Sequence, residues 1–423
     1  MNILFVHEVD WFRKVVFEIH TLSELLSLSG HRVYAIDYES MWVKNKPLDL
    51  GSLSTKTLNG IARAYPEASV CLKRPGFIKI PGLSRLSAAF THYREIQKTI
   101  KEKDIDVIIL YSVPTNGLQT IRLGRKFGIP VVFRAIDIPN QLVPYPALRP
   151  ITRLLERKIY SNAALILTLS PRLSQYVSNM GAPKAKVQLL PLGVDTNSFR
   201  PNLDGTEMLQ KWGFDKNDPI IVFIGTLFDF SGLDTFIRQF PEVLKEIPQA
   251  KLLIVGDGPQ RPKLAGIITE LGLEKQAIIT GFQPYQTMPQ YLNLAKICIN
   301  PFLITEATRD IFPTKIVQYL ACGKAVVATP LPGMLALAPG EHQGIVYANS
   351  PDGMVAEVIS LLKSTERRQS LEQAGLNYVK QTHSYDKITH QLEARLAEVI
   401  QEKREAAITK QEIRQEISRV KSR

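Results

Sequence analysis

Cysteines, long apolar runs and metal-ligand spacings are scarce in this 423-residue sequence. Its 3 cysteines are odd in number and far apart, which argues against a disulfide framework and fits a reducing compartment. Their spacing is not typical of a zinc site. No run of about 18 apolar residues exists, so we expect no membrane span. The opening residues, MNILFVHEVDWF, are typical of a short strand followed by charges, and we expect no signal peptide.

Apolar and basic residues, by contrast, are plentiful. Hydrophobic types make up 45% of the chain, which excludes global disorder, and the length predicts two domains with separate cores. The formal net charge is +12, and this excess lies entirely in residues 1–200, while residues 201–423 are neutral overall. Such asymmetry predicts that the first half faces something anionic: a membrane surface, a phosphorylated acceptor or nucleic acid.

Short apolar segments alternate with helical patterns along both halves of the chain. The clearest predicted strands are Asn2–His7, Arg32–Asp37, Val107–Tyr111, Ile220–Ile224, Lys251–Val255 and Ile297–Asn300. This alternation predicts the α/β class, with parallel sheets flanked by helices. A polar stretch near Pro201–Pro219 separates the two halves. We therefore predict domains at residues 1–200 and 201–384, followed by a charged helix or tail at 385–423.

One segment, Asn300–Thr329, carries the strongest functional pattern. It combines the end of an apolar strand, a polar loop, a helix beginning near Pro313, a tight glycine turn and a second apolar strand. Asp310 in the loop and Gln318 in the helix lie eight residues apart, so both can face one cleft. A helix N-terminus after a loop is a ready phosphate site, and nearby polar side chains could bind a sugar and a ribose. This layout predicts a nucleotide-sugar site.

Four motifs together resemble retaining glycosyltransferases of GT-B architecture, specifically glycosyltransferase family 4. They are KVQLLPLGVDTNSFRP at 186–201, the strand and glycine at Phe223–Gly225, LLIVGDGP at 252–259, and the segment 300–329. The resemblance covers almost the whole chain. It implies two doubly wound, Rossmann-like domains facing across a cleft, with the acceptor bound mainly by the first and the sugar nucleotide by the second. It also implies retention of configuration and neither a cofactor nor an obligatory metal.

The sequence departs from the family pattern where that pattern supplies charge. The family usually has glutamates at Asp310 and Gln318, and cations at the positions of Thr226 and Ser231. Gln318 can still accept a hydrogen bond from a ribose hydroxyl, but without charge assistance. A neutral acceptor costs about 1 kcal/mol relative to a charged one, so weaker nucleotide binding is expected.

Other residues could replace the missing charges. Lys315 is the natural substitute because it adjoins the phosphate-facing helix start, and Arg309, Arg13 and Lys14 are further candidates. Asp137 stands beside Ile136, which replaces a histidine of the family. The predicted catalytic residues are Asp137, Asp310 and Lys315. The predicted donor-binding residues are Arg13, Lys14, Gly225, Thr226, Gly256, Gly258, Arg309, Ile311, Phe312, Pro313, Thr314 and Gln318.

A second interpretation exists for several of these features. Asp310, Gln318 and Lys315 could be solvated surface groups, and the glycine turn at 256–258 a simple strand-to-helix connection. The segment Cys71–Lys103 has eight Lys or Arg against two Glu, with apolar residues interspersed. It could dock on an anionic bilayer or be an ordinary amphipathic helix packed on the sheet.

The resulting hypothesis is a glycosyltransferase that moves a sugar from a nucleoside diphosphate sugar to a lipid-linked or polysaccharide acceptor. We expect a cytoplasmic location, with peripheral attachment to the inner face of the plasma membrane left open. A catalytically degenerate GT-B scaffold, acting as partner of another transferase, is the alternative that the losses at Thr226, Ser231 and Gln318 suggest. Nucleic-acid binding is disfavoured because no aromatic-basic module is present.

Overall fold

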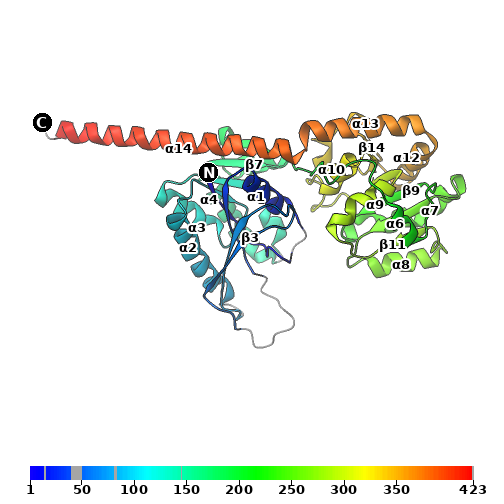
Figure 1. Ribbon diagram of the computed structural model, residues 1–423, viewed down its shortest axis with the longest axis horizontal. Coiled ribbons are helices and arrows are strands. Elements are labelled where there is room, and N and C mark those ends of the chain that lie inside the picture. The colour runs from blue at the N-terminus through cyan, green and yellow to red at the C-terminus, as the bar shows by residue number, and fades with distance from the viewer. Residues whose placement is uncertain (14–15, 40–49, 81–82, 144, 422–423) are drawn as a thin grey trace. The chain divides into compact units, whose positions relative to one another are not determined.

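The computed structural model describes the chain except residues 14–15, 40–49, 81–82, 144 and 422–423; for residues 142, 410, 411 and 413–421 it describes only the backbone. The chain divides into two compact units. The first contains residues 1–169, 173–190 and 389–423, and the second contains residues 170–172 and 191–388. Each unit is built around its own sheet with flanking helices (Figure 1).

An eight-stranded sheet forms the centre of the first unit, in the order β3-β4-β2-β1-β5-β6-β7-β8. Its central strands are buried on both faces, and their sequences are accordingly mostly apolar, with Arg134 and Thr168 as buried polar exceptions. All neighbours pair in parallel except β3, which is antiparallel to β4. The strands are β1 (Asn2–Val6), β2 (Arg32–Ile36), β3 (Thr55–Ile61), β4 (Val70–Pro75), β5 (Val107–Leu110), β6 (Val131–Ala135), β7 (Leu165–Thr168) and β8 (Val187–Leu189).

Helices of the first unit connect these strands. They are α1 (Glu18–Leu28), α2 (Ser84–Glu102), α3 (Gly117–Phe127), α4 (Arg149–Tyr160) and most of α5 (Pro171–Asn179), with short 3-10 turns η1 (Pro139–Leu142), η2 (Pro146–Leu148) and η3 (Lys184–Lys186). Helix α2 contacts α3, and α3 contacts α4, so the three lie in that order beside one another. Because each helix follows a parallel strand, its N-terminus lies toward the carboxyl edge of the sheet.

A six-stranded parallel sheet forms the centre of the second unit, in the order β11-β10-β9-β12-β13-β14. Its strands are β9 (Ile220–Ile224), β10 (Lys251–Val255), β11 (Ala277–Ile279), β12 (Ile297–Asn300), β13 (Ala325–Ala328) and β14 (Ile345–Tyr347). The order reverses between β9 and β12, so the carboxyl ends of these two strands mark the topological switch point where open α/β sheets bind ligands.

Helices surround the second sheet as well. They are α6 (Thr206–Trp212), α7 (Leu233–Glu246), α8 (Arg261–Glu270), α9 (Met288–Leu294), α10 (Thr314–Ala321), α11 (Pro332–Leu335), α12 (Pro351–Lys363) and α13 (Thr365–Thr382), with 3-10 turns η4 (Asp229–Ser231), η5 (Tyr285–Thr287) and η6 (Glu341–Gln343). Helix α7 contacts α12, and α10 contacts α13. Helix α10 begins at Thr314 after Pro313, close to the start that the sequence predicts.

The boundary between the units differs from the prediction of residue 200. Strand β8 is the last strand of the first sheet, and the chain joins the second unit from Pro191. There the Val194 N–H donates to the carbonyl of His383, and the Tyr385 N–H donates to the carbonyl of Val194. These bonds fix the segment to the second unit ten residues earlier than the polar stretch suggested. The antiparallel β3, too, departs from the expectation of a fully parallel sheet.

Residues 385–421 form one continuous helix, α14 (Tyr385–Lys421), and from Thr389 onward this helix belongs to the first unit. Leu392 and Leu396 are buried on that unit, and Arg404 pairs with Asp106 at 3.0 Å. The predicted third segment is therefore not a separate part of the structure. No described helix combines the length and the hydropathy that crossing a bilayer requires.

Candidate functional site

The switch point of the second unit brings two turns into close contact. The turn after β9 begins at Gly225, and the loop after β12 begins at Pro301. A methyl group on Gly232 would lie 1.9 Å from the carbonyl oxygen of Pro301, and the Leu303 N–H donates to the carbonyl of Phe230 at 2.9 Å. The carboxyl end of the sheet is therefore a packed platform on which side chains from both turns meet.

Glycines at this edge allow neighbouring turns of the backbone to pack closely. Gly225 has φ +134° and Gly256, at the end of β10, has φ +154°. A methyl group on Gly256 would lie 1.9 Å from the carbonyl oxygen of Gly225. The two turns can approach each other only because Gly256 lacks a side chain. Gly256 and Gly258, predicted as donor-binding, thus have a packing role that stands without a ligand.

Lys315 extends from the first turn of α10 to the β9 turn. A methyl group on Gly225 would lie 2.7 Å from the Lys315 Nζ, which places the ammonium at the glycine. The Nζ lies 3.7 Å from the ring centroid of Phe223 and 4.5 Å from that of Phe302. Two aromatic faces therefore flank the cation, an arrangement that stabilises positive charge.

No hydrogen bond or ion pair joins the Lys315 ammonium to any residue that the structure describes. Burial consequently lowers the pKa of Lys315 well below its usual range, with no carboxylate to raise it. In the first turn of α10, the Ile316 N–H donates to the carbonyl of Pro313 at 3.0 Å, while the N–H groups of Thr314 and Lys315 have no acceptor among the described residues. The Lys315 ammonium and the free N–H groups at the start of α10 are thus hydrogen-bond donors on one helical turn, and no described acidic side chain pairs with the ammonium. Such a set of donors is typical of an anion-binding site.

Gln318 lies one turn further along α10 and is only 7% exposed. Its amide nitrogen donates to the hydroxyl of Tyr285 at 3.4 Å, while its oxygen has no described donor. Tyr285 in turn packs against Phe199, with ring centroids 5.6 Å apart. Burial raises the pKa of Tyr285 to about 12, so the phenol is protonated at neutral pH. The sequence offered no signal for Tyr285, because its partner lies 33 residues away.

Asp310 lies in the loop before α10, and its side chain is 28% exposed. Its carboxylate pairs with Arg172 at 2.5 Å and lies 4.0 Å from the guanidinium of Arg309. The loop itself is held by a turn in which Thr305 and Thr308 bond to each other. Asp310 is therefore a partly accessible acceptor on an ordered loop, rather than a freely solvated group.

The short stretch between Asp310 and α10 is held from one side by an aromatic contact. Phe312 is 8% exposed, and its ring stacks on His383 with centroids 5.6 Å apart. His383 donates its Nδ1–H to the carbonyl of Leu192, and its Nε2 forms a hydrogen bond with the hydroxyl of Tyr378. Burial lowers the pKa of His383 to about 4. A neutral imidazole stacked on Phe312 fixes where α10 begins. Phe312 thus helps to hold the start of α10, and little of its surface is left for a ligand.

The remaining predicted residues of the second unit differ in accessibility. Thr226, Arg309 and Thr314 are exposed, and Ile311 is half-buried. Ser231, which stands where the family pattern has a cation, is only 2% exposed. Ser231 is neutral and buried, so it supplies no positive charge to a ligand. The Lys315 ammonium, which lies at Gly225, brings a positive charge to the β9 turn.

Asp137 lies in the first unit, just after β6 at the carboxyl edge of the sheet. Beneath it, Glu18 at the start of α1 forms a buried ion pair with Arg134, whose Nε and Nη2 donate at 2.6 and 2.8 Å. Surrounding protein, and secondly the charge of Glu18, raise the pKa of Asp137. Its side chain is nonetheless exposed, so water limits that effect.

The other predicted cations of the first unit contribute less. Arg13 is exposed and lies 3.9 Å from Asp10. Lys14 falls outside the described residues. The described residues contain no group of three or more His, Cys, Asp or Glu side chains that could hold a metal ion.

The switch point of the first unit, between β1 and β5, is closed by the protein itself. The Glu8 carboxylate accepts hydrogen bonds from the backbone N–H groups of Thr115 and Asn116, at 2.7 and 2.6 Å, just before α3. Burial raises the pKa of Glu8, an effect that these two bonds oppose. Arg85 lies 3.8 Å from the same carboxylate. Sequence reasoning missed this contact, which joins residues more than 100 positions apart.

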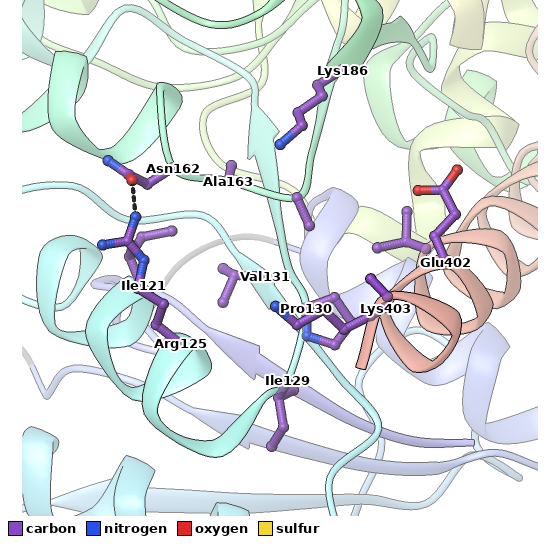
Figure 2. A pocket seen from close by; sticks show the side chains of 13 residues that line it. Ile121, Arg125, Ile129, Pro130, Val131, Asn162, Ala163, Lys186, Glu402 and Lys403 are labelled. Atoms are coloured by element: carbon purple, nitrogen blue, oxygen red, sulfur yellow. Dashed lines mark hydrogen bonds between the residues drawn. The ribbon is translucent and has the colours of Figure 1, made fainter. Parts of the chain in front are cut away.

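A cavity of about 250 Å³ lies elsewhere on the first unit. Its lining includes the residues that precede β6 and β7, so it opens at the amino edge of the sheet, opposite the carboxyl ends. Figure 2 shows Arg125 bonded to Asn162 on one side, and Glu402 and Lys403 of α14 on the other. This cavity contains none of the residues predicted from the sequence.

Two family profiles match the chain. "Glycosyl transferase 4-like domain" matches residues 63–193, and "Glycosyl transferases group 1" matches residues 218–364. The protein is a glycosyltransferase of the GT-B type. The second profile contains the switch point formed by β9 and β12, including Lys315 and Gln318.

Individual proteins resemble this glycosyltransferase at low identity. The GDP-mannose-dependent alpha-(1-6)-phosphatidylinositol monomannoside mannosyltransferase of Mycolicibacterium smegmatis is 28% identical over 264 residues, covering 62% of this chain and 68% of that protein. For the first five such relatives, the match spans 44% to 68% of their own lengths.

Solved structures share the fold over nearly the whole chain. Sucrose-phosphate synthase from Thermosynechococcus elongatus has a TM-score of 0.69 at 17% identity, covering 94% of this chain and 98% of that one. Anabaena HepE, solved in complex with UDP, has a TM-score of 0.66 at 16% identity, covering 94% and 100%. These TM-scores, over nearly the whole length of each chain, establish the GT-B fold.

Proposed function

We propose that this glycosyltransferase moves a sugar from a nucleoside diphosphate sugar to a lipid-linked or polysaccharide acceptor, with retention of configuration. The observation that carries the proposal is the Lys315 ammonium, which stands at Gly225 on the switch point without an acidic partner among the described residues. A diphosphate is the anion that a sugar-nucleotide donor would bring to it. The glycolipid-directed mannosyltransferase and the UDP complex among the similar proteins support a donor of this class.

The chemical task is to stabilise the negative charge that develops on the departing diphosphate as the glycosidic bond breaks. Preorganised donors in a water-poor site do this most effectively. Lys315 would place its charge on the phosphate oxygens, and the free N–H groups of Thr314 and Lys315 at the start of α10 would donate beside it. The protein's own residues supply this charge, so the proposal includes no metal and no cofactor.

Two side chains would bind the rest of the donor. The unoccupied oxygen of Gln318 would accept a hydrogen bond from a ribose hydroxyl, while Tyr285 holds the amide in place. Asp310 would accept from sugar hydroxyls, for which it would exchange part of its contact with Arg172. Asp137 of the first unit would orient the acceptor or the sugar. Arg309 is a further donor-side candidate because its guanidinium is exposed beside Asp310.

Asp310→Ala tests the sugar-binding role. We expect turnover to fall about 100-fold, because a charge-assisted contact made in the transition state is lost. The free energy of unfolding should change by less than about 1 kcal/mol, since the ion pair with Arg172 is partly exposed. Glu270→Ala, which removes an exposed carboxylate at the end of α8 that pairs with Arg238, is the control. Unchanged turnover with Asp310→Ala would remove this residue from the site.

A non-catalytic scaffold is the second candidate function. It is favoured by the neutral Thr226 and Ser231, which stand where the family pattern has cations, and by the neutral Gln318, which stands where that pattern has a glutamate. Sugar transfer by the purified chain, abolished by Lys315→Met, would end this alternative. A cytoplasmic location with peripheral attachment to the inner face of the plasma membrane is part of the main proposal, because the acceptor would be presented there.

A further inference from the structure

A row of apolar side chains on the first unit faces solvent along η2 and α4. Tyr145 is 69% exposed, Leu148 48%, Ile151 58% and Leu154 54%. Their spacing of three residues places them close together along one side of this segment. Four large apolar groups in sequence are unusual on a free surface, because burying each would gain roughly 1.5–3 kcal/mol.

Positive charge accompanies this row. Arg149, Arg153, Arg157 and Lys158 are exposed on α4, and none forms an ion pair with a described residue. The helix has a single acid, Glu156, which is fully buried and bonded to Asn140 and Tyr176. The exposed surface of α4 is therefore apolar and cationic, with no acidic group to neutralise it.

A second group of exposed apolar residues lies at the start of α2. Ile80, Leu83, Leu86 and Phe90 before and within the first half of α2 are 40%, 49%, 70% and 56% exposed. Helix α3 lies between α2 and α4 and contacts both. The N-terminal halves of these helices lie toward the carboxyl edge of the first sheet, so both apolar groups lie toward the edge that carries Asp137.

We infer that Tyr145, Leu148, Ile151, Leu154 and the exposed cations of α4 form a docking surface for an anionic lipid bilayer, extended by the apolar residues at the start of α2. Aliphatic and aromatic side chains would enter the boundary between headgroups and acyl chains, and the arginines would bind lipid phosphates. Charge complementarity selects this occupant: the surface combines four unpaired cations with apolar groups and offers no acid to a basic partner. The inference rests on the proposed function in one respect: docking on the membrane would bring a lipid-linked acceptor to the carboxyl edge of the first sheet.

Sequence reasoning anticipated part of this surface. It marked residues 71–103 as an apolar and basic segment with two interpretations, docking on a bilayer or packing on the sheet. Phe77 within it is 1% exposed and packs against Tyr38, as the second interpretation requires. Leu86 and Phe90 face solvent instead. The stronger site, η2 with α4, was not anticipated, because a helical pattern does not reveal which apolar residues lack a partner.

Vesicle sedimentation of the full chain tests the surface. Vesicles of phosphatidylcholine and phosphatidylglycerol in equal parts should bind the protein, and pure phosphatidylcholine should bind it at least about tenfold more weakly, since each cation near an anionic surface contributes about 1 kcal/mol. The double variant Ile151→Glu with Leu154→Glu should lose binding. Leu28→Glu is its matched control, because Leu28 is 45% exposed at the end of α1, on the opposite edge of the same sheet.

A second pair of variants isolates charge. Arg149→Glu with Arg153→Glu should weaken binding to the anionic vesicles about tenfold or more, whereas Arg32→Glu, at the exposed first position of β2, should not. Thermal unfolding verifies that each variant folds. Equal binding to neutral vesicles, unchanged binding by either double variant, or full displacement by inorganic phosphate would overturn the inference.

The readout also separates this inference from the proposed function. Vesicle binding requires no donor, so it can succeed where sugar transfer fails. Nucleotide binding by the second unit should be the same in Ile151→Glu with Leu154→Glu as in the unaltered chain. Loss of vesicle binding with intact nucleotide binding is the expected pair of results.

Discussion

The two switch points of this protein have opposite electrostatics although both sheets are wound in the same way. In the first unit, the Glu8 carboxylate occupies the backbone N–H groups before α3. In the second, the Lys315 ammonium stands at Gly225 with no described partner. The first switch point is satisfied by the chain itself, whereas the second has donors that still need an anion. The same topology thus gives a structural anchor in one unit and a binding site in the other.

Net charge alone would have suggested the reverse assignment. The positive excess of the chain lies in residues 1–200, and the second half is neutral. A phosphate site depends instead on one cation that is desolvated and unpaired, because an ion pair or bulk water would weaken its attraction for a ligand. The exposed cations of α4 suit a broad anionic surface, while Lys315 suits a single small anion.

Lys315→Met should have the largest effect. Removing the cation that stands at Gly225 should weaken binding of the nucleoside diphosphate by about 100-fold, as calorimetric titration would measure, because a charged hydrogen bond to the phosphate is lost. The free protein should be at least as stable, since a buried unpaired ammonium is replaced by an apolar side chain. Lys275→Met, at an exposed lysine, is the control. Equal weakening by both variants would contradict the assignment.

Glu8→Ala should destabilise the first unit at its switch point. Two buried N–H groups would lose their acceptor, so the free energy of unfolding should fall by about 1–3 kcal/mol. Denaturant unfolding measures this loss. Nucleotide binding by the second unit should not change. A variant that weakened nucleotide binding while leaving stability intact would show that the first switch point has a ligand role after all.

Gln318→Glu should strengthen nucleotide binding at the second switch point, by a smaller factor. A carboxylate can accept from the ribose with charge assistance, so the dissociation constant of the nucleotide should fall about fivefold, corresponding to about 1 kcal/mol. Tyr285 can donate to the new carboxylate and keep it in place. Gln318→Ala, which removes the acceptor, should change the constant in the opposite direction. Tighter binding with alanine would exclude the ribose contact.

Proton uptake on nucleotide binding is the smallest and most specific expectation. Burial lowers the pKa of Lys315 in the free protein, and a bound diphosphate would raise it, so the complex holds more protons than its components. Affinity should therefore increase as pH falls through the window between the two pKa values. Calorimetry in buffers of different ionisation enthalpy measures the uptake, which Lys315→Met should abolish. Uptake that persists in the variant would point to another group.

Local patterns predicted much of the fold and one end of the candidate site. The strands β9, β10 and β12 have the bounds that their apolar runs suggest, and α10 begins next to Pro313. Lys315 was singled out because a helix start follows the loop. Its aromatic neighbours Phe223 and Phe302 were not, since contacts between distant segments leave no periodic signal. The same reason explains why Tyr285 beside Gln318 was missed.

Long-range packing also decided the errors in domain organisation. The polar stretch near residue 201 suggested a boundary, but backbone bonds between Val194 and His383 attach the preceding segment to the second unit. The charged composition of residues 385–423 suggested a helix or tail separate from both domains. These residues form the helix α14, and its Leu392 and Leu396 pack on the first unit. Composition indicates how polar a segment is, but it does not indicate which surface of the protein the segment packs against.

Thermal unfolding with UDP, GDP, dTDP and ADP, each compared with its nucleoside lacking phosphate, tests the central claim most directly. A ligand at about 100 times its dissociation constant stabilises the folded state by roughly 2.7 kcal/mol, which is a readable shift. The account predicts stabilisation by one diphosphate and none by the matching nucleoside. No shift with any diphosphate at millimolar concentration, or an equal shift with the nucleoside, would contradict a diphosphate site at Lys315.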